Sequence, residues 1–156
     1  MLPAGDPPLT LLSGTQLSRT QRGVITTGVW PITVRNMITV AAVVASVLLT
    51  GLAVFQLLLA AGRPLGRLAW GGRHEVLPVS LRIGSVVSVV SYAVIAWLLW
   101  RAVAQPGDAG PWMWILTAFF GLGIVMNAAS RSRSERLVMT PVVAALAACC
   151  LLIALR

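Results

Sequence analysis

The chain contains no lysine, and it has only four acidic residues and one histidine among its 156 residues. Charged residues make up 10% of the sequence, whereas apolar residues make up 58%. A soluble domain carries about 25% charged residues, so this chain lacks the polar groups needed to cover its surface in water. The composition therefore excludes an ordinary soluble protein and indicates a protein that is solvated by lipid.

All of the strongly basic side chains are arginines, twelve in number, and they give a formal net charge of +8. They are spread over several loops and form no single stripe, which argues against nucleic-acid binding. Basic loops beside membrane spans are favoured by the anionic cytoplasmic leaflet. We therefore expect the arginines to lie in loops that flank the membrane spans, at the surfaces of the lipid bilayer, and we expect no nucleic-acid partner.

Residues for catalysis or for cofactor binding are scarce. The single histidine, His74, cannot supply the three protein ligands of a catalytic zinc, and the sequence has neither a phosphate-binding glycine loop nor a nucleophile turn. The two cysteines, Cys149 and Cys150, are adjacent and would point about 100° apart on a helix, so we expect packing residues and no disulfide. The sequence predicts a protein that is not an enzyme and that has no metal or cofactor.

Four long apolar stretches carry no charge in their interiors. About 20 helical residues cross the ~30 Å hydrocarbon core of a bilayer, and connections of roughly seven residues force successive helices to be antiparallel. The predicted fold class is all-α, an antiparallel four-helix transmembrane bundle. It occupies 37–156, with spans at about 37–61, 83–104, 112–130 and 137–155, and follows an N-terminal tail, 1–36, that is partly irregular or interfacial.

Proline and tryptophan mark the ends of these spans. Pro141 is expected in the first turn of the fourth span, where a missing N–H costs little. Tryptophan side chains prefer the membrane interface, and four of them surround the turn between the second and third spans. This tryptophan belt is expected to lie at the membrane interface and to mark one face of the bundle. Its members are Trp97, Trp100, Trp112 and Trp114.

A few polar residues interrupt the spans. Gln56 lies near the end of the first span and is expected to hydrogen-bond a neighbouring helix or loop. Ser85, Ser88 and Ser91 recur at every third residue of the second span, and Asn127 lies near the end of the third. These residues form either a helix-packing stripe or the lining of a solute path.

The stretch between the first two spans, 62–82, holds the only histidine, four arginines, four glycines and two prolines. One interpretation is a loop folded back onto the mouth of the bundle by an ion pair between Arg82 and Glu75. The other is a small polar site that binds an anionic headgroup or a partner protein. Its candidate residues are Trp70, Gly71, Gly72, Arg73, His74, Glu75 and Arg82.

The distribution of arginine predicts an orientation. Seven arginines lie in the two loops on one side of the membrane, and fewer lie near the membrane on the side of the termini. Short loops rich in arginine remain in the cytoplasm. We therefore expect loops 62–82 and 131–136 to be cytoplasmic and both termini to be outside, in the inner membrane of a bacterial cell.

The span layout invites comparison with small multidrug exporters, but the glutamate that they carry in the first helix has no counterpart between Met37 and Ala61. The loop motifs are PLG at 64–66, AWGG at 69–72, LP at 77–78 and RxxS at 82–85. Together with the layout, they resemble a pattern in small four-span bacterial membrane proteins without an assigned activity. This resemblance implies an inner-membrane helix bundle and transfers no catalytic residue.

Two functions remain open at this stage. Uncharged spans rich in alanine, glycine and serine favour a non-enzymatic accessory or scaffold subunit, which contacts another membrane protein or a second copy of itself. The alternative is a small transporter or channel for a neutral or weakly polar solute. A loop folded over a cavity would favour transport, and a free loop would favour docking of a partner.

Overall fold

The computed structural model describes residues 32–105 and 110–155. The chain divides into two units, Met1–Thr33 and Val34–Arg156. Of the first unit, only the two residues that begin a helix are described. The predicted tail therefore lies outside the described residues as far as residue 31, as does most of the turn between the second and third spans.

The described residues form four α-helices and two short 3-10 helices, with no β-strand among them. Each α-helix is long enough and apolar enough to cross a membrane. The chain is thus a multi-pass membrane protein, and the predicted all-α, four-helix fold class is confirmed. The elements are α2 (Ile32–Ala60), η2 (Gly66–Leu68), η3 (Trp70–Gly72), α3 (Val79–Ala104), α4 (Gly110–Ala128) and α5 (Arg133–Ala154).

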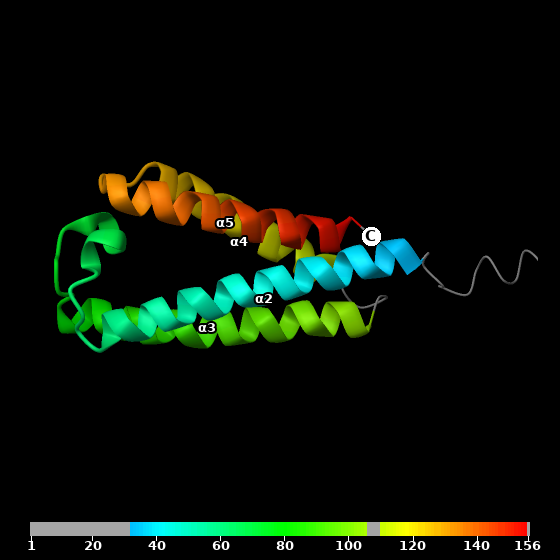
Figure 1. Ribbon diagram of the computed structural model, residues 1–156, viewed down its shortest axis with the longest axis horizontal. Helices are drawn as coiled ribbons and strands as arrows, with labels where there is room; N and C mark the ends of the chain where they lie inside the picture. The colour runs from blue at the N-terminus through cyan, green and yellow to red at the C-terminus, as the bar shows by residue number, and fades with distance from the viewer. Residues whose placement is uncertain (1–31, 106–109, 156) are drawn as a thin grey trace, which may run out of the picture. The chain divides into compact units, whose positions relative to one another are not determined.

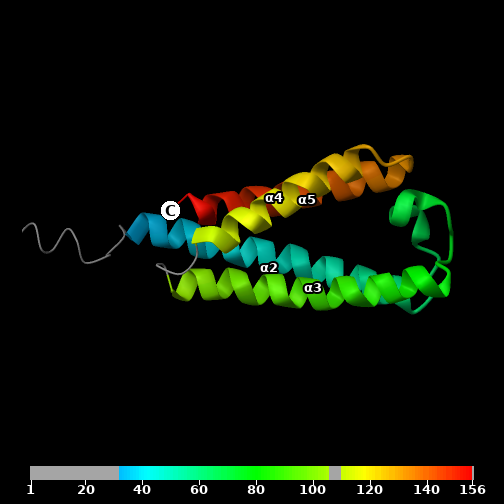
Figure 2. The same ribbon diagram turned by 180° about the vertical axis from the view of Figure 1, so that it is seen from behind.

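The four helices are arranged as two antiparallel pairs, α2 with α3 and α4 with α5 (Figures 1 and 2). Both views show the segment with η2 and η3 at the end where α2 stops and α5 begins. This segment reaches from the first pair toward the second, and it contacts α5. This segment therefore links the two helix pairs at that end of the bundle.

The main core joins all four helices through small and branched apolar side chains. On α2 the buried positions Ala41, Ala42 and Ala45 have exposed fractions of 5% or less, so the helix backbone comes close to its neighbours. Between α2 and α3, the Trp100 indole N–H donates a hydrogen bond of 3.1 Å to Ser46 Oγ. The other buried core residues include Leu49, Ile95, Leu99, Met113, Phe120, Leu146 and Ile153.

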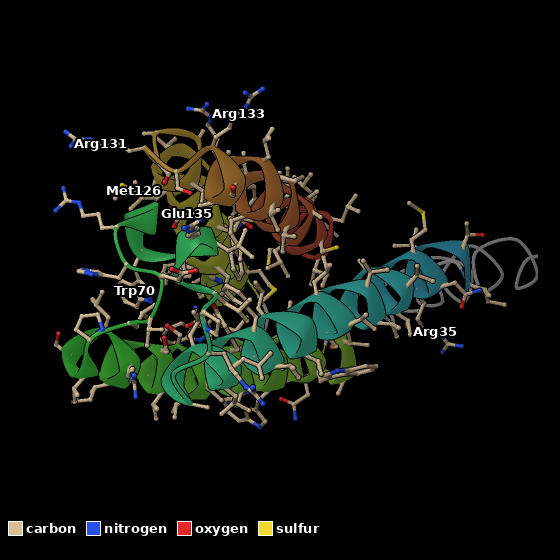
Figure 3. All side chains as sticks on the ribbon, turned by 60° about the vertical axis from the view of Figure 1, so that its left-hand side comes forward. Arg35, Trp70, Met126, Arg131, Arg133 and Glu135 are labelled. Carbon is tan, nitrogen blue, oxygen red and sulfur yellow. The ribbon has the colours of Figure 1, made fainter. Side chains whose placement is uncertain are left out.

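The belt tryptophans occupy the end of α3 and the beginning of α4, as predicted, and all four are exposed. Trp97 also stacks with the Arg101 guanidinium, whose carbon lies 5.6 Å from the ring centroid. Arg35 lies at this same end, far from Arg131 and Arg133 (Figure 3). The described arginines therefore gather mainly at the loop end, and the tryptophan belt lies at the other.

Two helix boundaries differ from the predicted spans in ways that matter. The helix α2 begins at Ile32, five residues before the predicted start at 37, and α5 begins at Arg133 instead of 137. The expectation for Pro141 is therefore wrong, because this residue lies in the interior of α5. Proline there removes one helical hydrogen bond, which membrane helices tolerate when neighbours satisfy the freed carbonyl. The earlier start also brings Glu135 into the first turn of α5.

Candidate functional site: a cavity covered by the 61–78 loop

Residues 61–78, here called the cover loop, begin with a tight helix end. Gly62 has φ of +81°, and the next residue, Arg63, donates its N–H to the Leu58 carbonyl at 3.0 Å. This left-handed glycine with a bond back across the last turn is a common way to end a helix. The guanidinium of Arg82 lies close over Gly62, where an added Cβ would come within 2.9 Å of it.

The cover loop is closed on itself by backbone contacts. The Gly66 N–H donates to the Glu75 carbonyl at 3.0 Å, and a Cβ at Gly66 would lie 2.2 Å from the His74 carbonyl oxygen. Only glycine fits such an approach. Ala69 and Leu77 of the loop form a small buried cluster with Leu59 of α2. The loop is therefore a folded element and not a free connection.

Two hydrogen bonds join the cover loop to the start of α5. The Gly71 N–H donates to Glu135 Oε2 at 3.0 Å, and the Ser132 hydroxyl donates to the Arg67 carbonyl at 2.6 Å. Gly72, with φ of +66°, packs against Ser132 so closely that an added Cβ would lie 2.6 Å from the serine Cβ. These contacts hold the loop over the space between the two helix pairs.

The loop folds onto the bundle, as one interpretation of the sequence expected. The expected ion pair between Arg82 and Glu75 does not hold it there. Glu75 instead lies 3.9 Å from Arg67, and both side chains are largely exposed. Arg82 donates its Nε–H to the Leu77 carbonyl at 2.8 Å, because its position in the first turn of α3 lets it cap the preceding loop. The anchoring carboxylate belongs to Glu135.

Glu135 is buried, with only 8% of its surface exposed. Ser132 caps α5 by accepting the Glu135 N–H at 3.3 Å, which is half of a capping box. The other half is missing, since the Ser132 N–H donates to Ser130 Oγ at 3.2 Å and the Ser130 hydroxyl donates to Glu135 Oε2. The carboxylate therefore does not bond back to the Ser132 N–H, and it faces the cover loop, where it accepts the Gly71 N–H (Figure 3).

Next to the cover loop lies a cavity of about 540 Å³ that is partly open to the outside. It extends from the loop to the level of Tyr92, which is near the middle of α3. All four helices and the loop contribute to its wall. The lining residues are Leu52, Phe55, Gln56, Leu68, Ala69, Trp70, Gly71, Ser88, Tyr92, Met126, Asn127, Ser130, Glu135, Met139 and Val143.

Gln56 is the most deeply buried amide in this wall, with 9% of its surface exposed. Gln56 lines the cavity together with Tyr92 of α3, and its Oε1 has no hydrogen-bond partner among the described residues. The expected hydrogen bond from Gln56 to a neighbouring helix or loop stays a prediction. A buried amide oxygen without a partner costs free energy, so its presence beside a cavity needs an explanation.

The three serines of the predicted stripe on α3 do not lie on one surface of the helix. Ser85 is fully buried and its hydroxyl has no partner among the described residues, whereas Ser88 lines the cavity and Ser91 is exposed on the outside of α3. Residues three apart on a helix point about 60° away from each other, so Ser85 and Ser91 point about 120° apart and cannot share one face. Ser88 and Asn127 are the predicted stripe residues that the structure brings to the cavity.

The candidate loop residues fall into three places. Trp70 and Gly71 line both the cavity and a second, outer pocket of about 430 Å³, whose wall also includes Arg73, His74 and Arg131. Gly72 contacts Ser132, and Glu75 and Arg82 lie outside both pockets. Trp70 itself has φ of +56° and packs on Gly84, which has no side chain to obstruct the indole.

Sequence reasoning missed Glu135 as part of the site, since it was grouped with the basic loop 131–136. The pattern Ser132-x-x-Glu135 is the signature of a helix start and is visible in the sequence. Within the described ranges 32–105 and 110–155, no group of three or more histidine, cysteine or acidic side chains is placed to hold a metal ion.

Comparison with protein-family models, curated proteins and solved structures finds no match for this chain.

Proposed function

We propose that this protein binds a small polar solute in the cavity beneath the cover loop and carries it across the membrane. The observation that supports this proposal is the cavity itself, about 540 Å³ in volume, with polar side chains in its wall and a folded loop over its mouth. Polar groups inside a membrane protein are costly and mark binding sites and pathways.

The cover loop is suited to opening and closing. Few bonds hold it to α5, chiefly those of Gly71 and Ser132, and Trp70 lines both the cavity and the outer pocket. Loops with few contacts open at low free-energy cost compared with a helix core. Movement of Trp70 would connect the cavity with the arginine-rich surface.

The same geometry weakens the scaffold interpretation. The small residues Ala41, Ala42 and Ala45 pack inside the chain and are not available to a partner. The loop that was the candidate docking surface is bonded to its own bundle. Transport therefore takes precedence over partner docking as the proposed role, and we propose no enzymatic activity.

The test is solute movement in proteoliposomes containing the full chain, with urea, glycerol and methylammonium as probes. We expect protein-dependent movement of at least one probe, reduced tenfold or more by Ser88→Leu, which fills the cavity. Ser91→Leu is the matched control, because the same substitution on the outer face of α3 leaves the cavity intact. Equal flux in protein-free liposomes, or equal effects of the two substitutions, would refute the proposal.

A second candidate, an accessory subunit, is favoured by an apolar groove between α3 and α4. Val86, Val90 and Val94 on α3 and Ile115 and Phe119 on α4 line a space of about 530 Å³ on the outside of the bundle. A helix from a partner or from a second copy would fit such a groove. Crosslinking in membranes from Val90→Cys should capture that helix, and exclusive monomer would argue against this candidate.

We also propose the membrane and the orientation. The described arginines on the cover-loop side include Arg63, Arg67, Arg73, Arg131 and Arg133, and their excess favours a cytoplasmic location for this side. The resemblance of the loop motifs to small bacterial four-span proteins favours the inner membrane. The arginine-rich outer pocket would then face the cytoplasm.

A further inference from the structure

Several polar side chains of the cavity wall have a donor that is already engaged within the protein. Asn127 donates one side-chain N–H to the Gly123 carbonyl at 2.8 Å, and Ser88 donates its hydroxyl to the Gly84 carbonyl at 3.0 Å. The Ser130 hydroxyl donates to Glu135. The oxygen atoms of these side chains therefore remain as acceptors for a ligand, in a wall that also holds the donors of Tyr92 and Trp70.

Two oxygen acceptors come from two different helices. On α4, the side-chain nitrogen of Asn127 donates to a carbonyl of its own helix, which leaves the side-chain oxygen. On α5, the hydrogen bonds to the Glu135 carboxylate from described residues both reach Oε2, which leaves Oε1. Gln56 on α2 also lines the cavity, but its Oε1 is enclosed by protein atoms, so the acceptors that border the cavity are one amide and one carboxylate.

Among the described residues that line the cavity, Glu135 is the one acid, and none is an arginine or a histidine. This part of the wall therefore carries a net negative charge. Arg131 and Arg133 point away from the body of the protein (Figure 3). The start of α5 and the Gly71 N–H offset part of the carboxylate charge, but a buried carboxylate is most favourable with a cation beside it.

The remainder of the wall is apolar and aromatic. Phe55, Tyr92 and Trp70 contribute rings, and Met126 and Met139 contribute flexible thioethers. Aromatic faces attract cations, and methionine side chains adapt to apolar groups of different shape. The wall therefore accommodates a positively charged group that carries an apolar body.

We propose that the solute is a small organic cation with N–H donors, a primary or secondary ammonium or a guanidinium joined to an apolar body. Its N–H groups donate to Glu135 and Asn127, and its body contacts the aromatic wall. An anion would meet the carboxylate without a compensating base, and a neutral alcohol would leave the buried charge unpaired. This inference rests on the proposed function, since it names the solute class for the same cavity.

The experiment measures binding of three probes of one shape to the full chain in lipid nanodiscs at pH 7 by calorimetry. The probes are phenethylamine, which is an ammonium at this pH, 2-phenylethanol and 3-phenylpropanoate. We expect the amine to bind at least tenfold more tightly than the alcohol and the carboxylate to bind most weakly. Equal binding of amine and alcohol, or tighter binding of the carboxylate, would overturn the assignment.

Substitutions locate the bound cation. Glu135→Gln should reduce amine binding tenfold or more and remove the preference for amine over alcohol, whereas Glu75→Gln, an acid on the exposed side of the cover loop, should change neither. Because Glu135 also anchors the loop, Asn127→Leu provides an independent variant with an expected three- to tenfold loss for the amine alone. Unchanged amine affinity in Asn127→Leu would count against the assignment even if Glu135→Gln failed to fold.

The binding and flux results separate the two proposals. If urea, glycerol or methylammonium crosses in a Ser88-dependent way while the amine has no advantage in binding, the cation assignment fails and transport stands. If no probe binds and none crosses, both proposals fail. Tight amine binding without movement of methylammonium would retain the cation site and remove the transport step.

Discussion

Gly71 in the cover loop donates its backbone N–H to the carboxylate of Glu135 at 3.0 Å, across 64 positions of sequence. This bond joins the connection between the first two spans to the first turn of α5. It places a buried negative charge at the boundary between the loop and the cavity. The stability of the loop and the chemistry of the cavity thus depend on one side chain.

Replacing this carboxylate should loosen the cover loop. Glu135→Ala leaves the Gly71 N–H and the Ser130 hydroxyl without their acceptor, at a cost of about 1–3 kcal/mol for buried groups. Trypsin should then cleave at Arg67 or Arg73 at least tenfold faster in detergent-solubilised protein. Glu75→Ala, which removes an exposed ion pair, should leave the cleavage rate within about twofold; equal rates for the two variants would contradict the anchoring role.

The two adjacent glycines of the loop should respond differently to alanine. Both have positive φ, which costs alanine roughly 1–2 kcal/mol. At Gly71 an added Cβ meets nothing within 4 Å, whereas at Gly72 it would lie 2.6 Å from the Ser132 Cβ. Thermal unfolding in detergent should show Gly72→Ala to be the less stable variant. Equal midpoints would show that the loop is not held against Ser132.

The bond between α2 and α3 should contribute modestly to stability. Ser46→Ala removes the acceptor of the Trp100 indole N–H, and interhelical hydrogen bonds in membranes are worth about 0.6 kcal/mol on average. The matched control is Ser91→Ala, because the Ser91 hydroxyl bonds only to the Val87 carbonyl of its own helix. Reversible unfolding by a denaturing detergent should separate the two, and a larger loss for Ser91→Ala would refute the pairing.

Opening the mouth should expose the cavity wall. Trp70→Ala removes the indole that lines both the cavity and the outer pocket. In a background with Cys149→Ala and Cys150→Ala, a cysteine at position 127 should react at least fivefold faster with a membrane-impermeant thiol reagent after this change. Trp114→Ala, at the opposite end of the bundle, serves as the control; equal acceleration by both would argue against Trp70 as the barrier.

The orientation is also open to direct measurement. A cysteine in place of Ser134, at the arginine-rich end, should be labelled by an impermeant reagent in inverted membrane vesicles and protected in right-side-out vesicles. The charge asymmetry that motivates this expectation is the excess of arginine on the cover-loop side. Labelling with the reverse preference would place the outer pocket outside the cell.

The architecture could be predicted from sequence because its cause is local. An uncharged run such as 37–61 must cross lipid as a helix, whatever lies beside it, since the bilayer core leaves no other way to satisfy backbone hydrogen bonds. The tryptophans at the end of α3 and the beginning of α4 could be predicted for the same reason. Helix ends were harder, and the fourth helix begins early because Ser132 caps it.

The site depended on contacts between distant residues, which composition and spacing do not reveal. The sequence indicated that a loop folds onto the bundle, but it suggested Glu75 as the anchoring acid because Glu75 lies near Arg82 in the chain. The anchor is Glu135, which sequence distance hides. In the same way, the spacing of Ser85, Ser88 and Ser91 predicted one stripe, while the packing of α3 sends each serine to a different environment.

The unequal lengths of the helices have a consequence for the surrounding membrane. At ~1.5 Å per residue, the 29 residues of α2 extend to ~44 Å, whereas the 19 residues of α4 extend to ~29 Å. A hydrocarbon layer ~30 Å thick matches α4, and α2 must lean or protrude to fit it. Because the loop that follows α2 is bonded to α5, a tilt of α2 forced by a thinner bilayer would act on the hydrogen bonds of Gly71 and Ser132.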